Sequence, residues 1–207
     1  MVPKYWSSVK ELMTEDTFVV KSVPYIDPTA PNPMKMYATE FFKNGRVQKK
    51  KIKEHASYPY SFLREEMQEH ILDKLQLLIE SRAIKGTFEN GTEYTITATV
   101  LNLPKEIVRL IQKFDFTKKN PKLIYFNTGE KMISLEDSIL TAFLNLVGFD
   151  VVFFVPTGYQ NIEKHFNKRL MEEHQVGEYV YDLQVPNMAL VPSGTRPSWR
   201  DKIFRRL

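Results

Sequence analysis

The feature that most constrains the fold is a pair of short, uninterrupted apolar runs joined by a helical segment. The runs are Lys122 to Phe126 (KLIYF) and Val151 to Val155 (VVFFV). Between them, Ser134 to Val147 has the apolar spacing of a helix, with Ser134 as its N-cap, Asp137 as a further cap residue and Gly148 as its stop. Fully buried strands joined by a helix are typical of parallel pairs. The sequence therefore predicts a βαβ unit.

The segments that follow extend this unit. We expect a second helix over Gln160 to His174 and a further strand over Tyr179 to Leu183, and then loop and a short terminal segment around Trp199 to Arg206. Residues 121–207 are thus predicted to form a Rossmann-like βαβα unit with parallel strands and a basic C-terminal tail.

Residues before about 60 are rich in aromatics and proline, and we expect strands rather than helices there. Asp16 to Ile26 is expected to be a strand. Asn44-Gly45 predicts a hairpin between Ala38 to Phe42 and Val47 to Ile52, because both turn residues accept positive φ. The lysines of this stretch would then lie on a strand.

A long amphipathic helix is predicted from Ser61, as its N-cap, to Ile79. Thr92 to Val100 (TEYTITATV) alternates as a strand does, and Pro104 opens a short helix that ends at Lys113. The polar residues 115–121 are the predicted boundary between an N-terminal region and the C-terminal unit. The predicted fold class is α/β, with an N-terminal α+β region over residues 1–120 and the α/β unit over residues 121–207, or else one continuous domain.

Composition excludes several classes of function. The chain has no cysteine, so disulfides, thiolate metal sites and cysteine nucleophiles are excluded. No apolar run approaches the ~20 residues of a membrane span, and no leader peptide is recognisable, so we expect a cytoplasmic protein. A net charge of +4 on 207 residues is too small to indicate nucleic-acid binding, although Lys49 to Lys51 could meet phosphate.

Two loops are the candidate ligand site. Parallel sheets bind ligands beyond the carboxyl ends of their strands, where loops and helix N-termini present free N–H groups. The polar residues of these two loops are Asn127, Thr128, Gly129 and Glu130, and Thr157, Gly158, Tyr159, Gln160 and Asn161. An alternative is that both loops are structural turns. Neither loop matches a P-loop or a dinucleotide fingerprint.

The sequence does not settle whether the chain is an enzyme. Glu130 is the best-placed candidate for acid/base work, because it lies in the first loop itself. The four histidines show no metal-ligand spacing, so no metal site is predicted, and no cofactor is indicated.

Three segments resemble the bacterial YceG-type family: Phe154 to Glu163 (FVPTGYQNIE), Glu178 to Leu183 (EYVYDL) and Ser198 to Phe204 (SWRDKIF). The resemblance is strongest over residues 123–207, and it implies the C-terminal portion of a longer cytoplasmic bacterial protein. It also implies a stress-response role in a biosynthetic module encoded beside tellurite and toxic-anion stress genes. It supplies no catalytic residues.

Three functions compete. The first is a ligand-binding α/β portion that binds a phosphorylated or nucleotide-like metabolite at the two loops. The second is a non-catalytic module that binds protein partners of a stress complex, through the aromatic and basic tail. The third, nucleic-acid binding through the lysines of the predicted hairpin, is the least favoured.

Overall fold

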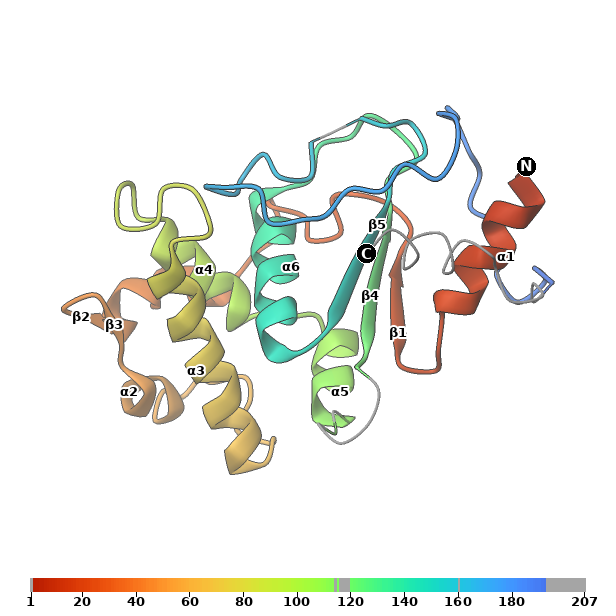
Figure 1. The fold of residues 1–207 in the computed structure, drawn as a ribbon. Coiled ribbons are helices and arrows are strands. Elements are labelled where there is room, and N and C mark those ends of the chain that lie inside the picture. The colour runs from red at the N-terminus through yellow and green to blue at the C-terminus, as the bar shows by residue number, and fades with distance from the viewer. Residues whose placement is uncertain (1, 114, 116–119, 160, 193–207) are drawn as a thin grey trace, which may run out of the picture.

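A three-stranded parallel sheet lies at the centre of the fold (Figure 1). The computed structural model describes residues 2–113, 115, 120–159 and 161–192. The strands are β1 (Thr17–Val20), β4 (Lys122–Phe126) and β5 (Asp150–Phe154), in the order β1-β4-β5. Both pairs are parallel, with Val19 opposite Ile124 and Ile124 opposite Val152. The predicted parallel pairing is therefore confirmed, and the sheet takes a strand from each side of the predicted boundary.

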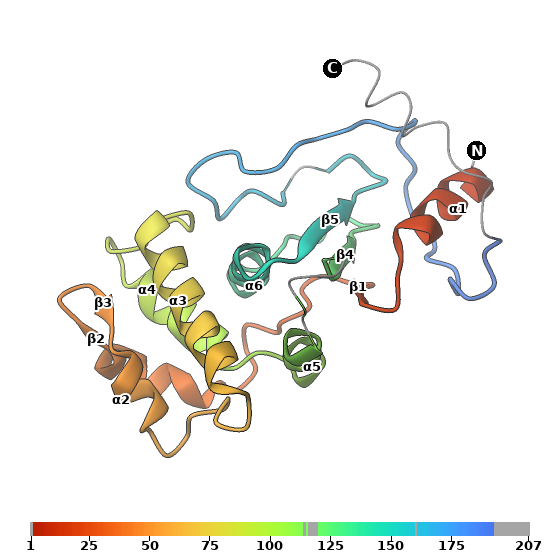
Figure 2. The ribbon, with the colours of Figure 1, turned by 60° about the horizontal axis from the view of Figure 1, so that its bottom comes forward.

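Helices cover both faces of the sheet. Helix α6 (Leu135–Val147) packs on one face and α1 (Val2–Leu12) on the other, as Figure 2 shows. Side chains of the central strand β4 alternate between these two layers, with Leu123 and Tyr125 in the α6 core and Ile124 and Phe126 in the α1 cluster. The prediction of two fully buried strands is right for β4 only. The side chains of β5 are mostly half-buried, because β5 is an edge strand.

The predicted N-cap Ser134 and the predicted stop Gly148 of α6 are both observed, whereas Asp137 has a different role from the predicted one. Ser134 Oγ accepts from the Asp137 N–H at 3.0 Å, and Gly148 ends the helix. The buried Asp137 carboxylate reaches beyond its own helix and accepts from the backbone N–H groups of Tyr25 and Ile26, each at 2.8 Å. Burial raises the pKa of this carboxyl, although its hydrogen bonds act in the opposite direction. Asp137 thus ties the chain that follows β1 to α6.

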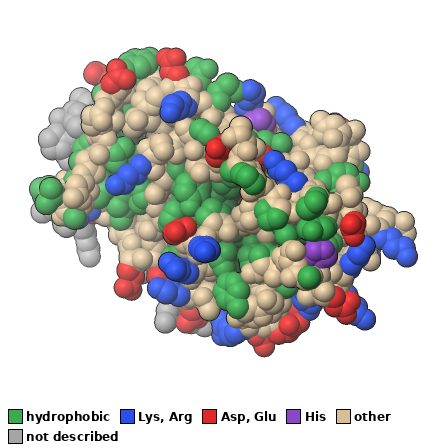
Figure 3. Space-filling model, turned by 180° about the vertical axis from the view of Figure 1, so that it is seen from behind, with side chains coloured by type: hydrophobic (Ala, Val, Ile, Leu, Met, Phe, Trp, Pro, Cys, Tyr) green, Lys and Arg blue, Asp and Glu red, His purple; other side chains and the backbone are tan. Residues whose placement is uncertain are grey.

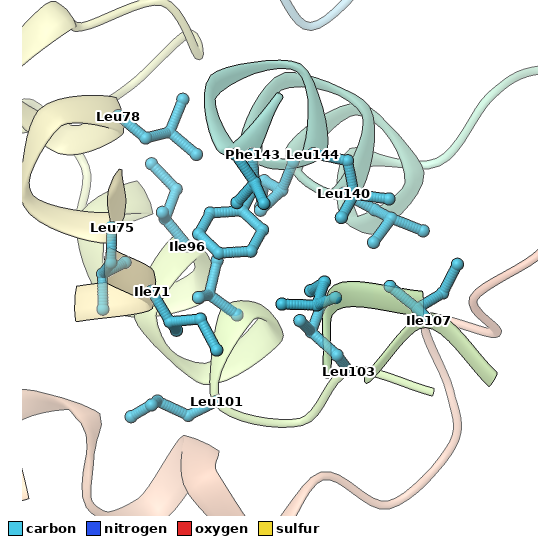
Figure 4. Close-up of a cluster of buried hydrophobic side chains, with 14 of the residues drawn as sticks. Ile71, Leu75, Leu78, Ile96, Leu101, Leu103, Ile107, Leu140, Phe143 and Leu144 are labelled. Carbon is cyan, nitrogen blue, oxygen red and sulfur yellow. The ribbon is translucent and has the colours of Figure 1, made fainter. Parts of the chain in front are cut away.

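The main core lies between α6 and three further helices: α3 (Glu65–Ser81), α4 (Thr92–Val100) and α5 (Lys105–Lys113). Figure 4 shows side chains of α3, α4 and α6 meeting there, with Ile96 of α4 facing Phe143 of α6. Helix α5 occupies the predicted position after Pro104. Burial of this apolar surface is the main term that stabilises the domain.

Helix α4 replaces a predicted strand, and that prediction was wrong. Its nine residues include six β-branched ones, which favour strands on propensity alone. Seven of the nine are nevertheless buried, because α4 lies among α3, α6 and the short helix η1 (Pro33–Met36). Tertiary packing here outweighs a propensity difference of ~0.5 kcal/mol per residue.

The N-terminal region contains helices that were not expected: α1, η1, η2 (Ala38–Phe41) and α2 (Lys49–Lys53). The hairpin itself is confirmed, with β2 (Phe42–Lys43) antiparallel to β3 (Arg46–Val47). Its turn residues Asn44 and Gly45 have φ of 54° and 73°. The hairpin is much shorter than predicted, since residues 38–41 and 49–53 are helical. The lysines of residues 49–53 therefore lie on a helix, not on a strand.

Two predicted boundaries also moved. Helix α3 begins at Glu65, and its N-cap is Arg64 rather than Ser61. Phe62, which lies within the predicted helix, precedes α3 and is 64% exposed. Strand β1 covers only the first part of the predicted Asp16–Ile26 strand, because residues 25 and 26 bend away to bond Asp137.

No helix forms in the described part of Gln160–His174, so that prediction was wrong. Backbone groups of the segment bond elsewhere: the Lys85 N–H donates to the His165 carbonyl and the Asn167 N–H to the Ala83 carbonyl. Ile84 and Phe166 form an isolated bridge. Residues 179–183 form no strand either. The βαβ unit is thus present, whereas the second helix of the Rossmann-like pattern is not.

The terminal segment Trp199 to Arg206 lies outside the described residues. In the part of the chain that is described, no helix combines the length and apolar character needed to cross a bilayer.

Candidate functional site at the strand ends

The two predicted loops meet at one edge of the sheet, beyond the ends of β4 and β5 (Figure 1). The Asn127 N–H donates to the Phe154 carbonyl at 3.0 Å, which continues the strand pairing into the first loop. The Lys131 carbonyl then accepts from two side chains, Asn127 Nδ2 at 3.2 Å and Asn161 Nδ2 at 2.8 Å. One backbone carbonyl therefore joins both loops.

The predicted site residues differ in how accessible they are. Asn127, Thr157 and Asn161 are buried, each at most 7% exposed. Thr128, Gly129 and Gly158 are half-buried, and Glu130 and Tyr159 are exposed. Gln160 lies outside the described residues.

The loop after β5 turns sharply and does not lead into a helix. The Gly158 N–H bonds the Val155 carbonyl at 3.0 Å, and the φ of Gly158 is +69°. We expected a helix N-terminus here that would attract an anion, and this expectation was wrong because the following residues are not helical. The loop contains instead a short turn in which the Tyr159 N–H donates to Thr157 Oγ1 at 3.3 Å.

A later segment covers this loop, which the sequence did not suggest. The Val180 N–H donates to the Pro156 carbonyl at 2.8 Å. The ring of Tyr179 lies so close to Gly158 that a Cβ at that position would be 2.2 Å from it. Figure 1 shows this C-terminal segment passing across the ends of the strands. Tyr179 and Val180 therefore belong to the surroundings of the site.

Asn161 has an unused acceptor. Its Oδ1 is buried and has no hydrogen-bond partner among the described residues. The amide cannot be turned to remove this deficit, because Nδ2 must face the Lys131 carbonyl and an amide oxygen there would meet another acceptor. A buried polar atom without a partner is uncommon in a folded protein and calls for a specific explanation.

Two lysines in the segments that follow β4 and β5 form no ion pair in the described structure. Lys131 and Lys164 have no ion-pair partner within the residues that the structure describes. Lys164 Nζ lies 3.7 Å from the sulfur of Met132, which follows Lys131, and Lys85 Nζ donates to the Lys164 carbonyl at 2.7 Å. Neither ammonium group therefore lies within ion-pair distance of a described carboxylate.

The lysines of α2 behave differently. Each is paired with at least one carboxylate: Lys49 with Glu69 and Asp73, Lys50 with Glu54, Lys51 with Glu40, and Lys53 with Glu65 and Glu69. An open depression lined by residues 47–51 and Glu54 lies beside them, away from the strand ends. Their charge is already compensated, so the observed pairing gives no support to nucleic-acid binding there.

His165 is the titratable group that the sequence did not single out for this site. Burial lowers the pKa of its imidazole below 6.5, and Lys164 and Lys85 act in the same direction. A hydrogen bond to the backbone of Ile133, together with Glu136, acts in the opposite direction. His165 is therefore a half-buried imidazole beside the β4–α6 loop, in surroundings that disfavour its charged form. Glu130, the predicted acid/base candidate, is exposed to solvent.

The described residues contain no group of three His, Asp or Glu side chains placed to hold a metal ion. This edge offers amide, hydroxyl and backbone hydrogen bonds, the imidazole of His165, the exposed carboxylate of Glu130, and two lysine ammonium groups that form no ion pair in the described structure.

Comparison with known proteins identifies the family of the chain. Residues 2–185 match the family model described as the YceG domain. The chain belongs to the YceG domain family. A family relative from Bacillus subtilis (strain 168), described as "Uncharacterized protein YceG", is 23% identical over 194 residues. The alignment covers 91% of this chain and 36% of the relative, so the chain spans just over a third of the relative's length. No solved structure matches.

The predicted family is thus confirmed, and the family match covers residues 2–185, whereas the resemblance in the sequence was strongest over residues 123–207. Because the relative is described only as uncharacterised, the family assignment names no substrate.

Proposed function

We propose that the strand-end edge binds a phosphorylated or nucleotide-like small molecule, and that the chain is the ligand-binding α/β portion of a YceG family protein. The observation that carries the proposal is the meeting of both loops at the Lys131 carbonyl, next to the buried and unpartnered Asn161 Oδ1. Ligands of open parallel sheets bind at this edge, where loops of adjacent strands come together.

The charges support an anionic group on the ligand. Lys131 and Lys164 lack carboxylate partners in the described structure and belong to the two segments that the Lys131 carbonyl joins. An ammonium group held near a loop can bind phosphate as a point charge. The first turn of α6 gives no such support, because it already contains Glu136 and Asp137. The phosphate is therefore proposed to meet the lysines rather than the helix end.

The biological setting belongs to the same proposal. The family resemblance implied a cytoplasmic bacterial stress-response protein of a biosynthetic or tellurite-resistance module. A phosphorylated or nucleotide-like metabolite fits such a module.

A thermal-shift screen with nucleotides, nucleotide sugars and sugar phosphates tests the proposal. A ligand present at ~100 times its Kd stabilises the folded state by about 2.7 kcal/mol, enough to raise the Tm by several degrees. The best blocking variant is Gly129→Val, since no atom lies within 4 Å of the Cβ position and its φ is not in the left-handed region. This variant should fold as the wild type does.

A charge variant completes the experiment. Lys131→Met with Lys164→Met should abolish the shift, whereas the matched control Lys50→Met, on the compensated helix α2, should leave it unchanged. If no compound shifts the wild type, or if the shift survives both blocking variants, the strand-end site is wrong.

A second candidate, a non-catalytic interaction module, is favoured by exposed apolar side chains on the C-terminal segment. They are Leu170 (47% exposed), Val176 (68%), Tyr179 (57%), Tyr181 (65%) and Leu190 (81%). Figure 3 shows, on the face opposite to that of Figure 1, further hydrophobic side chains grouped among charged ones. Exposed apolar groups that gather into a contiguous patch are typical of protein-binding surfaces.

The interaction hypothesis predicts loss of a partner on substitution. Val176→Ser with Tyr181→Ser should remove a co-purifying protein in affinity purification from the host bacterium, and Phe62→Ser, at an exposed apolar position near α3, serves as the control. An unchanged set of co-purifying proteins would count against the module.

A further inference from the structure

We infer that Asn161 is a specificity residue that accepts a hydrogen bond from a hydroxyl or amino group of the ligand, so that the ligand class is a phosphorylated polyol, such as a sugar phosphate or a nucleotide. The inference rests on the proposed function, because it concerns the same site. It starts from the orientation of one amide.

The orientation of the Asn161 amide is fixed by its neighbour. Nδ2 donates to the Lys131 carbonyl at 2.8 Å, and the same carbonyl is shared with Asn127 Nδ2 at 3.2 Å. Since a carbonyl oxygen only accepts, the face of the Asn161 amide toward Lys131 must be its NH₂ group. Oδ1 therefore points away from Lys131, as an acceptor without a donor.

The position of this unpartnered atom distinguishes it from the others. Within the described residues, the other buried side-chain atoms without a partner are the hydroxyls of Tyr58, Thr99, Tyr125 and Thr141. A hydroxyl rotates and also carries its own donor hydrogen, whereas an amide oxygen is a fixed acceptor. Asn161 Oδ1 is the fixed acceptor of this set, and it lies in the loop that follows β5.

The missing partner defines a ligand group. Oδ1 needs an O–H or N–H donor, which sugar and ribose hydroxyls and base amino groups supply. The phosphate dianion has no donor hydrogen, so its place is at Lys131 and Lys164. A site with a buried acceptor rejects analogues that lack the matching donor, because the acceptor then stays unpaired and water does not reach it.

The test compares phosphates with and without hydroxyl groups. The probes are ribose 5-phosphate, glucose 6-phosphate and AMP, against methyl phosphate and inorganic phosphate, titrated by calorimetry into the full chain. We expect the wild type to bind at least one hydroxyl-bearing probe about tenfold or more tightly than methyl phosphate, which is the discrimination that one buried hydrogen bond gives.

The variant Asn161→Leu should remove that preference. It deletes the acceptor while Asn127 keeps the Lys131 carbonyl bonded, so its affinities for ribose 5-phosphate and methyl phosphate should agree within about twofold. Thr99→Val is the matched control: it removes an unpartnered buried acceptor on α4, away from the loops, and should retain the wild-type preference.

Each outcome decides between the two proposals. Equal binding of hydroxyl-bearing probes and methyl phosphate by the wild type would overturn the role of Asn161 and leave the phosphate site standing. The same holds if Asn161→Leu keeps the full preference. If the wild type binds none of the probes, the proposed function fails and the inference fails with it. The wild-type comparison alone decides the matter if Asn161→Leu does not fold.

Discussion

Replacing Asp137 with alanine should destabilise the fold strongly, because its carboxylate joins two segments that are far apart in sequence. The carboxylate accepts from the backbone N–H groups of Tyr25 and Ile26, each at 2.8 Å, and is fully buried. Alanine leaves both donors without a partner at a partly buried place. The segment after β1 then loses its attachment to α6.

The size of the loss follows from the two bonds. A hydrogen bond to a charged group contributes ~1.5–3 kcal/mol, so two contribute about 3–6 kcal/mol. The buried charge itself opposes folding, as the raised pKa of the carboxyl indicates. Removing this charge therefore offsets part of the free energy that is lost with the two hydrogen bonds. We therefore expect Asp137→Ala to lower the free energy of unfolding by about 2–4 kcal/mol and the Tm by about 5–15 °C. Asp137→Asn keeps one acceptor and should fall about halfway between.

Urea denaturation followed by circular dichroism measures this loss, and hydrogen exchange locates it. The amide protons of Tyr25 and Ile26 should exchange faster in Asp137→Ala. Glu136→Ala is the control, since Glu136 is the neighbouring acidic residue of the same helical turn, and it should change stability by less than about 0.5 kcal/mol. An Asp137→Ala variant within 0.5 kcal/mol of the wild type, or one with unchanged exchange at both amides, would refute the reasoning.

Three further predictions concern other parts of the molecule. Tyr60→Phe should lower the free energy of unfolding in urea by about 1–3 kcal/mol, because the buried hydroxyl joins the end of α4 to the turn before α5 through two backbone hydrogen bonds. Gly158→Ala should lower the Tm because its Cβ would meet the Tyr179 ring, whereas Gly129→Ala should leave the Tm within about 1 °C; equal values would contradict the described packing. The imidazole of His165 should titrate below its ordinary 6.5 by NMR. Because its folded-state pKa is lowered, the stability it contributes is present above pH 6.5 and is lost as the pH falls through the folded pKa, so the pH dependence should weaken in His165→Gln.

The β4-α6-β5 unit was predictable because each local signal agrees with its neighbours. Two apolar runs, a Ser cap at residue 134 and a Gly stop at residue 148 all indicate the same structure, and the strand ends then determine where the two loops meet. Propensity failed where packing decided the outcome. The β-branched residues of α4 form a helix because nearly all of its side chains are buried among other helices.

Long-range hydrogen bonds explain the missing second helix. Glu163 Oε1 accepts from the N–H groups of Leu170 and Met171, and the backbone near His165 pairs with the loop after α3. A local sequence pattern cannot predict hydrogen-bond partners that lie some 80 positions away, as Lys85 does from His165. The same holds at the site, where the loop residues could be named from sequence but the shared Lys131 carbonyl and the covering Tyr179 could not.

The pairing of β1 with β4 has a practical consequence for dissecting the molecule. Thr17 pairs with Lys122, so the sheet is completed only when segments roughly a hundred residues apart have met, a topology that folds slowly and late in synthesis. A fragment cut near residue 120 would release β4 with one bare edge of backbone N–H and C=O groups, and its apolar side chains would lose the layer that α1 provides. Such an edge recruits other strands, so the isolated C-terminal piece would self-associate, and fragments for structural work should retain the strand at residues 17–20.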